Sequence, residues 1–462
     1  MINQREHWGS RIGFILAATG SAIGLGNIWK FPYIAGENGG AAFIFIYLIC
    51  IAIIGLPVLI AEILLGRTTQ RNPVGAFKAL SSSRGWMAVG GMGVVAGFVI
   101  LSFYSVVAGW SLGYIIEAGS GVFAGFTDAT VAGAHFAGLV ASPGWTVGFH
   151  VVFFLLTMGV VYAGVQKGIE RGSKIMMPVL FVILLVLVIR GLTLPGAEAG
   201  MDFLWNPDWS KVTGSAVLIA LGHAFFTLSL GMGAMMTYGS YMSDQDNIPV
   251  AAVQIVFLDT LIALLAGVAI FTAVFATGQD PAAGPGLIFQ TLPAVFARMP
   301  GGTGFAVLFF LLLTIAALTS AISLLEVVVA YFVDEKGWRR HRAVLVFGIV
   351  ILLVGVPSAL SFNLLADWKL FGLTFFDLAD FLASNVLLPA GGLAIAVFVA
   401  WIWGFDRALP KLKAGAVELF EHSPGRVKLL AFFLKFVSPI LIFLVLLNST
   451  GLLPKIISWF KG

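Results

Sequence analysis

The residues with the clearest chemical potential are one carboxylate and two glycine-rich clusters inside apolar stretches. Asp259 is the only acid between residues 248 and 276. One cluster runs from Gly20 to Asn27 and the other from Ser229 to Gly233. Glycine weakens a helix by roughly 1 kcal/mol relative to alanine, so both clusters predict helix breaks. In an apolar surrounding the freed backbone groups need partners, and a bound ion and a zwitterion could supply them.

Composition places these residues in a membrane protein. Charged residues make up 10% of the 462 positions and the mean hydropathy is +1.01, whereas a soluble domain carries about 25% charge. Runs of roughly 20 mostly apolar residues recur, and each is long enough to cross a bilayer as a helix. A transmembrane barrel would need alternating segments, yet residues 181–189 are apolar throughout. We therefore predict an all-α polytopic membrane protein, in which a buried carboxylate marks a functional site.

The apolar runs predict 11 transmembrane helices. They begin near residues 11, 41, 88, 146, 174, 214, 248, 304, 342, 375 and 430. Lys and Arg collect before the first span and after the second, fourth, eighth and tenth, whereas the loop from 119 to 145 has none. Because cytoplasmic loops are enriched in these residues, we expect a multi-pass protein of the plasma membrane with a cytoplasmic N-terminus.

Residues 1–462 are expected to form a single transmembrane domain. Its predicted parts are a first five-helix repeat at 10–191, a second, inverted five-helix repeat at 214–404, and a loop with the eleventh helix at 405–462. Each glycine cluster then falls in the first helix of a repeat, so helices 1 and 6 are broken. Broken helices at corresponding positions of inverted repeats indicate a transporter site. Close helix packing through small residues is the alternative interpretation.

Other functional classes find little support. The pI of 9.1 arises from charges in short loops without a basic-aromatic stretch, so no nucleic-acid partner is expected. A lone Cys50 excludes a disulfide framework and a thiolate metal site. Motifs of metalloproteases and of nucleophile elbows are missing, which argues against an enzyme. A channel is disfavoured because no filter motif is evident, and a non-transporting amino-acid sensor remains an alternative.

At four motifs the sequence resembles the neurotransmitter:sodium symporter family, and within it the bacterial hydrophobic amino-acid transporters. The motifs are Arg5 to Trp8, Gly24 to Tyr33, Glu37 to Gly40 and Phe225 to Ser229. The similarity runs over nearly the whole chain. It implies sodium-coupled symport of aliphatic or aromatic amino acids by alternating access, with Na+ as the coupled ion and the lipid bilayer as the surrounding medium.

The resemblance also implies two sodium sites. The matching positions are Ala22, Asn27, Thr227 and Asp259 for one ion, and Gly20, Ile23, Ala316, Thr319 and Ser320 for the other. Carbonyls, hydroxyls, an amide and a carboxylate are the oxygen ligands that hard cations prefer. Many relatives have Asn in place of Asp259 and take their negative charge from chloride or from a Glu one turn later, where this chain has Ala263. We therefore expect transport to be independent of chloride.

For the substrate, the resemblance implies a pocket with one polar end. Tyr104 matches a hydroxyl that contacts the substrate carboxylate, and amides near Leu25 and Gly26 would add donors at a helix N-terminus. Gly24 stands where monoamine transporters have Asp, which favours a substrate with its own carboxylate. The predicted set is Ala22, Leu25, Gly26, Ile100, Tyr104, Phe226, Thr227, Ser229, Met232, Ser320 and Leu324. Taken singly, each apolar member also fits ordinary core packing.

Two gates follow from the same match. Lys30 and Asp380 would flank an outer vestibule with Phe226 as a lid over the substrate, and Arg5 and Asp334 would pair on the cytoplasmic side. Exposed ion pairs contribute at most about 1 kcal/mol, which suits gates that must open. Interfacial snorkelling is the alternative for Lys30.

Four further residues carry expectations. Gly168 and Pro178 are separated by nine residues in a spacing similar to a family motif, and this segment could unwind and admit water to the second sodium. Glu62 matches a carboxylate that accepts hydrogen bonds from the broken sixth helix. His223 replaces a frequent Gln, and we expect it to be a buried, hydrogen-bonded histidine, with a titrating imidazole as the alternative.

Overall fold

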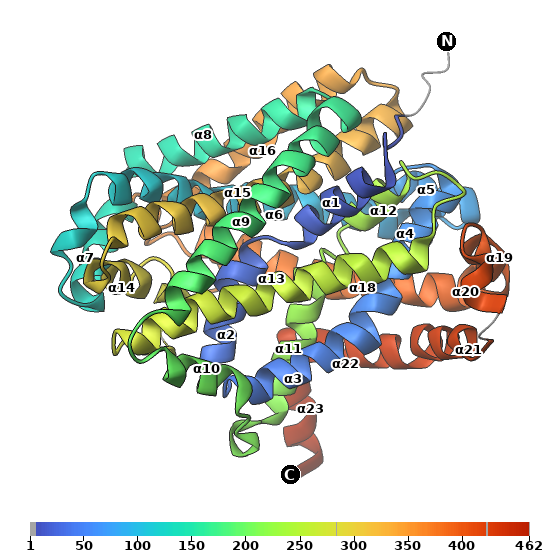
Figure 1. Cartoon of the computed structure of the whole chain (residues 1–462). Coiled ribbons are helices and arrows are strands. Elements are labelled where there is room, and N and C mark those ends of the chain that lie inside the picture. Colours follow the sequence, from blue (N-terminus) through green and yellow to red (C-terminus); the bar gives the residue numbers. More distant parts are fainter. Residues whose placement is uncertain (1–5, 283, 422–423, 462) are drawn as a thin grey trace.

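The chain folds into a bundle of helices (Figure 1). A computed structural model describes residues 6–282, 284–421 and 424–461. Within these ranges no β-strand forms, and the only strand-like pairing is an isolated bridge between Leu370 and Leu373. The predicted all-α fold is confirmed.

Nine helices of the described ranges are long and apolar enough to cross a membrane. Several consist of α-helical pieces joined by a π-helical turn. The nine comprise α3 (Ala41–Cys50) with η2 (Ile51–Gly55) and α4 (Leu56–Thr69); α6 (Arg84–Gly119); α8 (Pro143–Tyr162); η4 (Val165–Glu170) with α9 (Arg171–Leu192); α13 (Ile248–Ala276); α15 (Gly302–Lys336); α16 (Arg340–Leu360); α17 (Phe375–Asp380) with η7 (Phe381–Leu387), α18 (Leu388–Val397) and η8 (Phe398–Ile402); and α21 (Pro424–Phe432) with η9 (Phe433–Val437) and α22 (Ser438–Ser449).

The two remaining predicted spans are the broken ones. The first consists of α1 (Arg11–Ala22), then η1 (Gly26–Lys30) and α2 (Phe31–Glu37), with a bend of 48° at the break. The sixth consists of α11 (Gly214–Thr227) and α12 (Ala234–Gly239), separated by six residues without helical structure. Both breaks fall in the glycine clusters, as the sequence predicted.

Short helices connect the spans, and the last of them, α23, follows the final span. They are α5 (Pro73–Leu80), η3 (Val122–Gly125), α7 (Ala129–Val140), α10 (Ala197–Trp205), η5 (Trp209–Lys211), η6 (Gly284–Leu287), α14 (Thr291–Arg298), α19 (Phe405–Lys413), α20 (Val417–Glu421) and α23 (Leu452–Lys461).

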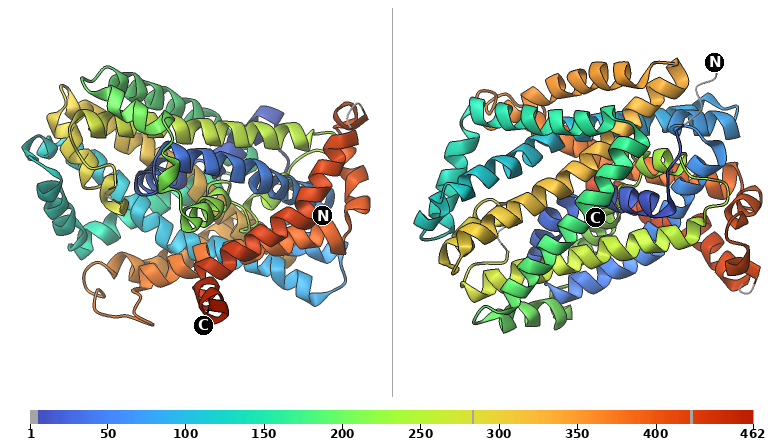
Figure 2. Two further views of the ribbon diagram at one scale, coloured as in Figure 1. Left: turned by 90° about the horizontal axis from the view of Figure 1, so that it is seen from below. Right: turned by 45° about the horizontal axis from the view of Figure 1, so that its top comes forward.

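The broken spans lie inside the bundle. Between Gly13 and Ala22, every residue of α1 except Leu16 is buried, and α9, α13 and α15 pack against this helix (Figure 2). Side-chain oxygens cap the starts of both broken spans, because Ser10 accepts from the Gly13 N–H and Thr213 accepts from the Ala216 N–H, each at 3.1 Å. Such caps stabilise a helix N-terminus, so the breaks sit between well-anchored helical segments.

The fifth span begins earlier than the sequence predicted. The helix begins at Val165 rather than near residue 174, and the segment from Gly168 to Pro178 is helical throughout. Gly168 lies in the π-helical turn η4, where a Cβ atom would meet the carbonyl oxygen of Val160, and Pro178 lies within α9. The segment is therefore wound in this structure.

Candidate functional site

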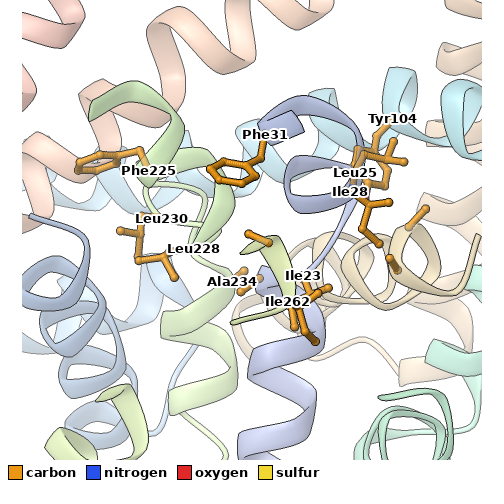
Figure 3. Close-up of a cluster of buried hydrophobic side chains, with 14 of the residues drawn as sticks. Ile23, Leu25, Ile28, Phe31, Tyr104, Phe225, Leu228, Leu230, Ala234 and Ile262 are labelled. Atoms are coloured by element: carbon orange, nitrogen blue, oxygen red, sulfur yellow. The ribbon is translucent and has the colours of Figure 1, made fainter. Parts of the chain in front are cut away.

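The two helix breaks are tied to each other by a hydrogen bond. After α1, Ile23 adopts an extended backbone, and between α11 and α12 the residues Ser229, Gly231 and Gly233 have φ angles of 54°, 82° and 76°. Ser229 Oγ donates to the carbonyl oxygen of Ser21 at 2.8 Å. Apolar side chains from both breaks, including Ile23 and Leu228, enter the same buried cluster (Figure 3).

A buried carboxylate supports the second break, as expected for Glu62. The Gly231 N–H donates to Glu62 Oε1 at 2.6 Å, and Glu62 is fully buried. A Cβ atom on Gly231 would meet the carbonyl oxygen of Leu388. The positive φ and the close approach together require glycine at this position.

A cavity with an empty volume of about 340 Å³ lies where the breaks meet α6 and α15. Ten of the eleven predicted substrate residues line it, and the lining consists of Ser21, Ala22, Gly24, Leu25, Gly26, Ile100, Tyr104, Phe226, Ser229, Met232, Ser320 and Leu324. The eleventh, Thr227, faces Asp259 instead. The sequence analysis did not predict Ser21. Its backbone carbonyl oxygen makes the contacts, and every residue has such an oxygen.

The polar end of this cavity is built around Tyr104. Its hydroxyl accepts a hydrogen bond from the Leu25 N–H at 3.1 Å, and the two side chains lie side by side in Figure 3. A Cβ atom on Gly24 would lie 2.7 Å from this hydroxyl and even closer to Ser320 Oγ. Only glycine at position 24 leaves room between the two hydroxyl groups.

Two residues of the first predicted sodium site, Asn27 and Thr227, contact the carboxylate of a third, Asp259. Asn27 Nδ2 donates to Asp259 Oδ1 at 2.8 Å, and Thr227 Oγ1 lies 3.2 Å from both carboxylate oxygens. All three side chains are at most 1% exposed, and Ala22 lines the adjoining cavity. Among the described residues the hydrogen-bond partners of Asp259 are neutral, whereas a buried carboxylate is costly without a compensating positive charge. The donor set therefore fits a bound cation.

The second predicted set is also assembled. Thr319 Oγ1 lies 3.5 Å from the Ile23 carbonyl oxygen and 2.9 Å from that of Ala316. Ser320 Oγ lies 3.0, 3.3 and 3.5 Å from the carbonyl oxygens of Ser21, Ile23 and Gly20. One hydroxyl proton cannot satisfy three carbonyl oxygens. Such a convergence of oxygens suits a hard cation.

The predicted outer pair shares a second cavity of about 460 Å³, which Lys30 and Asp380 both line. Phe226 lines this cavity and the first one. In the described part of the chain, Lys30 and Asp380 form no ion pair within 4 Å. The Lys30 ammonium lies 4.6 Å from the centre of the Phe226 ring, and Asp380 accepts a hydrogen bond from Ser384 Oγ at 2.7 Å.

The predicted inner pair is described only on one side, because Arg5 lies outside the described residues. Asp334 accepts from the backbone N–H of Asn72 at 2.9 Å and from its side-chain amide at 3.2 Å. Trp8, which follows Arg5 in the same motif, donates through Nε1 to the Tyr238 carbonyl at 2.9 Å. The N-terminal segment is thus docked against α12.

The expectation of a hydrogen-bonded His223 is wrong. The ring is buried and stacks on Phe31 with a centroid separation of 5.8 Å, but neither ring nitrogen has a hydrogen-bond partner within the described residues. His223 lines a cavity between α11, α18 and α22. Burial alone was predictable from the apolar stretch, whereas bonding depends on residues far away in sequence.

Comparisons with known proteins show what the whole chain is similar to. Residues 5–124 and 140–456 match the model of the Sodium:neurotransmitter symporter family. An uncharacterized sodium-dependent transporter, YhdH of Bacillus subtilis, is 44% identical over 448 residues, covering 96% of this chain and 98% of that protein. An uncharacterized sodium-dependent transporter of Haemophilus influenzae is 35% identical, with coverage of 96% and 98%. The crystal structure of MhsT in complex with L-phenylalanine has 47% sequence identity and a TM-score of 0.88, covering 96% of this chain and 100% of that one.

Proposed function

Because the chain belongs to the sodium:neurotransmitter symporter family, whose members are secondary transporters rather than enzymes, we propose that this sodium-dependent transporter carries hydrophobic amino acids. Sodium and an aliphatic or aromatic amino acid fill the site between the helix breaks, an outer gate closes over them, and both are released inward. The sodium gradient drives accumulation, because ligand and ion together bind one conformation better than the other.

The observation that carries this proposal is the two-ended character of the cavity. Its polar end offers the Tyr104 hydroxyl and the amides at the start of η1, which favour a carboxylate. Its other walls are the apolar side chains of Ile100, Phe226 and Leu324. A solved neighbour with 47% identity is in complex with L-phenylalanine, which supports the same substrate class here.

Met232 favours a broad set of hydrophobic side chains over one size. It lies between Gly231 and Gly233, which both have positive φ. An unbranched thioether fills irregular space, and flanking glycines let the backbone shift. We expect aliphatic and aromatic substrates to be accepted in the same cavity.

Asp259 supports sodium coupling without chloride. The first ion would be held by Ala22, Asn27, Thr227 and Asp259, and the second by Gly20, Ile23, Ala316, Thr319 and Ser320. The Asp259 carboxylate supplies a fixed negative charge beside the first ion. The role that chloride has in some relatives is then filled by the protein itself.

A screen of the twenty amino acids tests the proposal. Purified protein should bind hydrophobic amino acids in sodium and not in potassium, and proteoliposomes should accumulate them against a gradient. Binding without accumulation would identify a sensor, and sodium-activated flux that only follows the substrate gradient would identify a channel. Accumulation should persist when chloride is replaced by gluconate, and its collapse would refute chloride independence. Tyr104→Phe serves as the matched control, because it removes only the hydroxyl at the polar end.

A further inference from the structure

His150 is a buried histidine of α8 that the proposed transport cycle leaves without a role. Its Nε2 atom lies 3.0 Å from the carbonyl oxygen of Leu352 in α16, and its Nδ1 atom lies 3.0 Å from Ser105 Oγ in α6. The helices α8 and α16 are neighbours in the bundle (Figure 1), and α6 packs against both. One side chain therefore connects three helices that are far apart in the sequence.

The two partners determine which ring nitrogen carries the hydrogen. The Leu352 carbonyl oxygen can only accept, so Nε2 is the donor. In the neutral ring Nδ1 is then an acceptor, and Ser105 Oγ donates to it. Ser105 Oγ also lies 2.7 Å from the Leu101 carbonyl oxygen, but that oxygen already accepts within the helix. A buried Nδ1 without a donor would be costly, so the bond to His150 is the one that the geometry favours.

Glycines let the three helices close around this ring. A Cβ atom on Gly355 of α16 would lie 2.7 Å from His150 Cε1 and 2.5 Å from the Ser102 carbonyl oxygen of α6. A Cβ atom on Gly109 of α6 would lie 2.8 Å from the His150 backbone nitrogen. Small residues allow helices in a membrane to approach this closely. The ring is thus enclosed, and its two hydrogen bonds fix the register of α6 against α8 and α16.

The face of α6 that binds His150 lies next to the face that lines the substrate cavity. Residues four apart in a helix share a face. Ile100 and Tyr104 line the cavity, and Leu101 and Ser105 each follow by one residue. A rotation or slide of α6 that moves Ser105 therefore moves Tyr104 as well. The Tyr104 hydroxyl is 3.1 Å from the Leu25 amide, and such a bond is lost beyond about 3.5 Å.

We propose that His150 is a positioning residue of the substrate site, whose two hydrogen bonds hold α6 in the register at which the Tyr104 hydroxyl meets the substrate carboxylate. His150 lines neither the substrate cavity nor the outer one, so it acts through α6. The competing explanation is packing alone, for which an apolar ring of similar size would serve as well. The inference rests on the proposed function for the carboxylate, but not for the contacts.

Equilibrium binding of L-phenylalanine to purified protein separates positioning from packing. His150→Phe keeps a buried ring but removes both hydrogen bonds, and it should weaken binding about tenfold in saturating sodium. His150→Gln retains a donor and an acceptor, and it should bind within about threefold of the parent. Sodium affinity without amino acid should stay within about twofold in both variants, because the predicted cation ligands lie on other helices than α6.

Ser105→Ala removes the other end of the same connection and leaves the ring unchanged, so it decides the question if His150→Phe fails to fold. It should also weaken binding, and in a Tyr104→Phe background neither variant should weaken binding further, because the affected contact is already missing. Thr157→Ala is the matched control. Thr157 is likewise buried in α8, but its hydroxyl donates to the Phe153 carbonyl of its own helix at 3.1 Å, so this variant should bind like the parent.

Fluorine NMR of protein labelled with fluorotyrosine reads the position of Tyr104 without any amino acid. The chain has eight tyrosines, and Tyr104→Phe identifies the signal of Tyr104. This signal should shift in His150→Phe and in Ser105→Ala but not in Thr157→Ala. An unshifted signal in the first two variants would overturn the inference, and so would parent-like binding by His150→Phe or losses that add to that of Tyr104→Phe. A parent protein that binds no amino acid in sodium would instead refute the proposed function, while the Tyr104 signal would still report on the connection.

Discussion

At the scale of single residues, Asp259 is the side chain whose charge the site depends on most. Asp259→Asn keeps the shape and the hydrogen bonds from Asn27 and Thr227 but removes the charge. We expect sodium affinity to fall at least tenfold, about 1.4 kcal/mol. In potassium the melting temperature should stay level or rise, because a buried carboxylate without a cation is unfavourable. Titration of sodium against purified protein, together with thermal unfolding in both ions, measures both effects.

The prediction is specific because sodium affinity should fall while the melting temperature in potassium should not. A general structural defect would lower stability in potassium as well as in sodium. Sodium affinity equal to that of the parent protein would contradict the assignment of Asp259 to the first ion.

Gly24 is the residue whose missing side chain keeps the polar end open. In Gly24→Ala, the new methyl group would lie 2.7 Å from the Tyr104 hydroxyl, and it would displace this group from the Leu25 amide. Amino-acid binding should weaken more than tenfold, as measured by equilibrium binding in saturating sodium. Gly91→Ala, also in a long helix but with no heavy atom within 4 Å of the added carbon, should bind like the parent.

At the scale of elements, the break in the sixth span requires a specific backbone. Gly231→Ala places a side chain at a φ angle of 82° and against the Leu388 carbonyl. We expect a loss of about 1–3 kcal/mol in stability, seen as a lower melting temperature. Gly91→Ala should instead stabilise by up to about 1 kcal/mol, because alanine is the better helix former. Equal melting temperatures for the two variants would show that the break tolerates a side chain at position 231.

The sequence predicted both breaks because glycine acts locally, through its own conformational freedom. The π-helical turns were not predictable, since nothing in the residues of η2 or η4 distinguishes them from an α-helix. The fifth span was placed too late because Lys167, Glu170 and Arg171 lower its hydropathy. The helix nevertheless begins at Val165, where Glu6 and Gln166 connect it to the N-terminal segment.

The sequence predicted the parts of the site that are formed by polar side chains. Asp259 and Thr227 stand out as polar groups in apolar stretches, and the structure brings them together. The carbonyl oxygens of Gly20, Ser21 and Ile23 carry no such signal, because every residue has one. Their convergence on Ser320 follows from the break in α1 and the packing of α15, and distant contacts of this kind cannot be deduced from spacing.

At the scale of the whole molecule, burial separates helices that enclose the site from helices that face the surroundings. Of the most apolar window of α6, 72% is buried, against 39% for α16. The outward residues Ile189 and Leu353 are about 60% exposed, at 62% and 60%. Lipid tails are as apolar as leucine, so this surface suits a bilayer. The distribution of Lys and Arg predicts the orientation, with the N-terminus expected in the cytoplasm.

Cysteine labelling tests that direction, because the chain has one cysteine and Cys50 is only 3% exposed. In a Cys50→Ala background, Ser120→Cys lies in the exposed turn after α6, and Ser82→Cys lies in the exposed link before it. With a cytoplasmic N-terminus, a membrane-impermeant maleimide should label Ser120→Cys in intact cells and Ser82→Cys only after permeabilisation. The reverse labelling pattern would show that the protein has the opposite orientation in the membrane. The Lys30 vestibule would then face the cytoplasm, and sodium entering from outside would first meet the opposite end of the site.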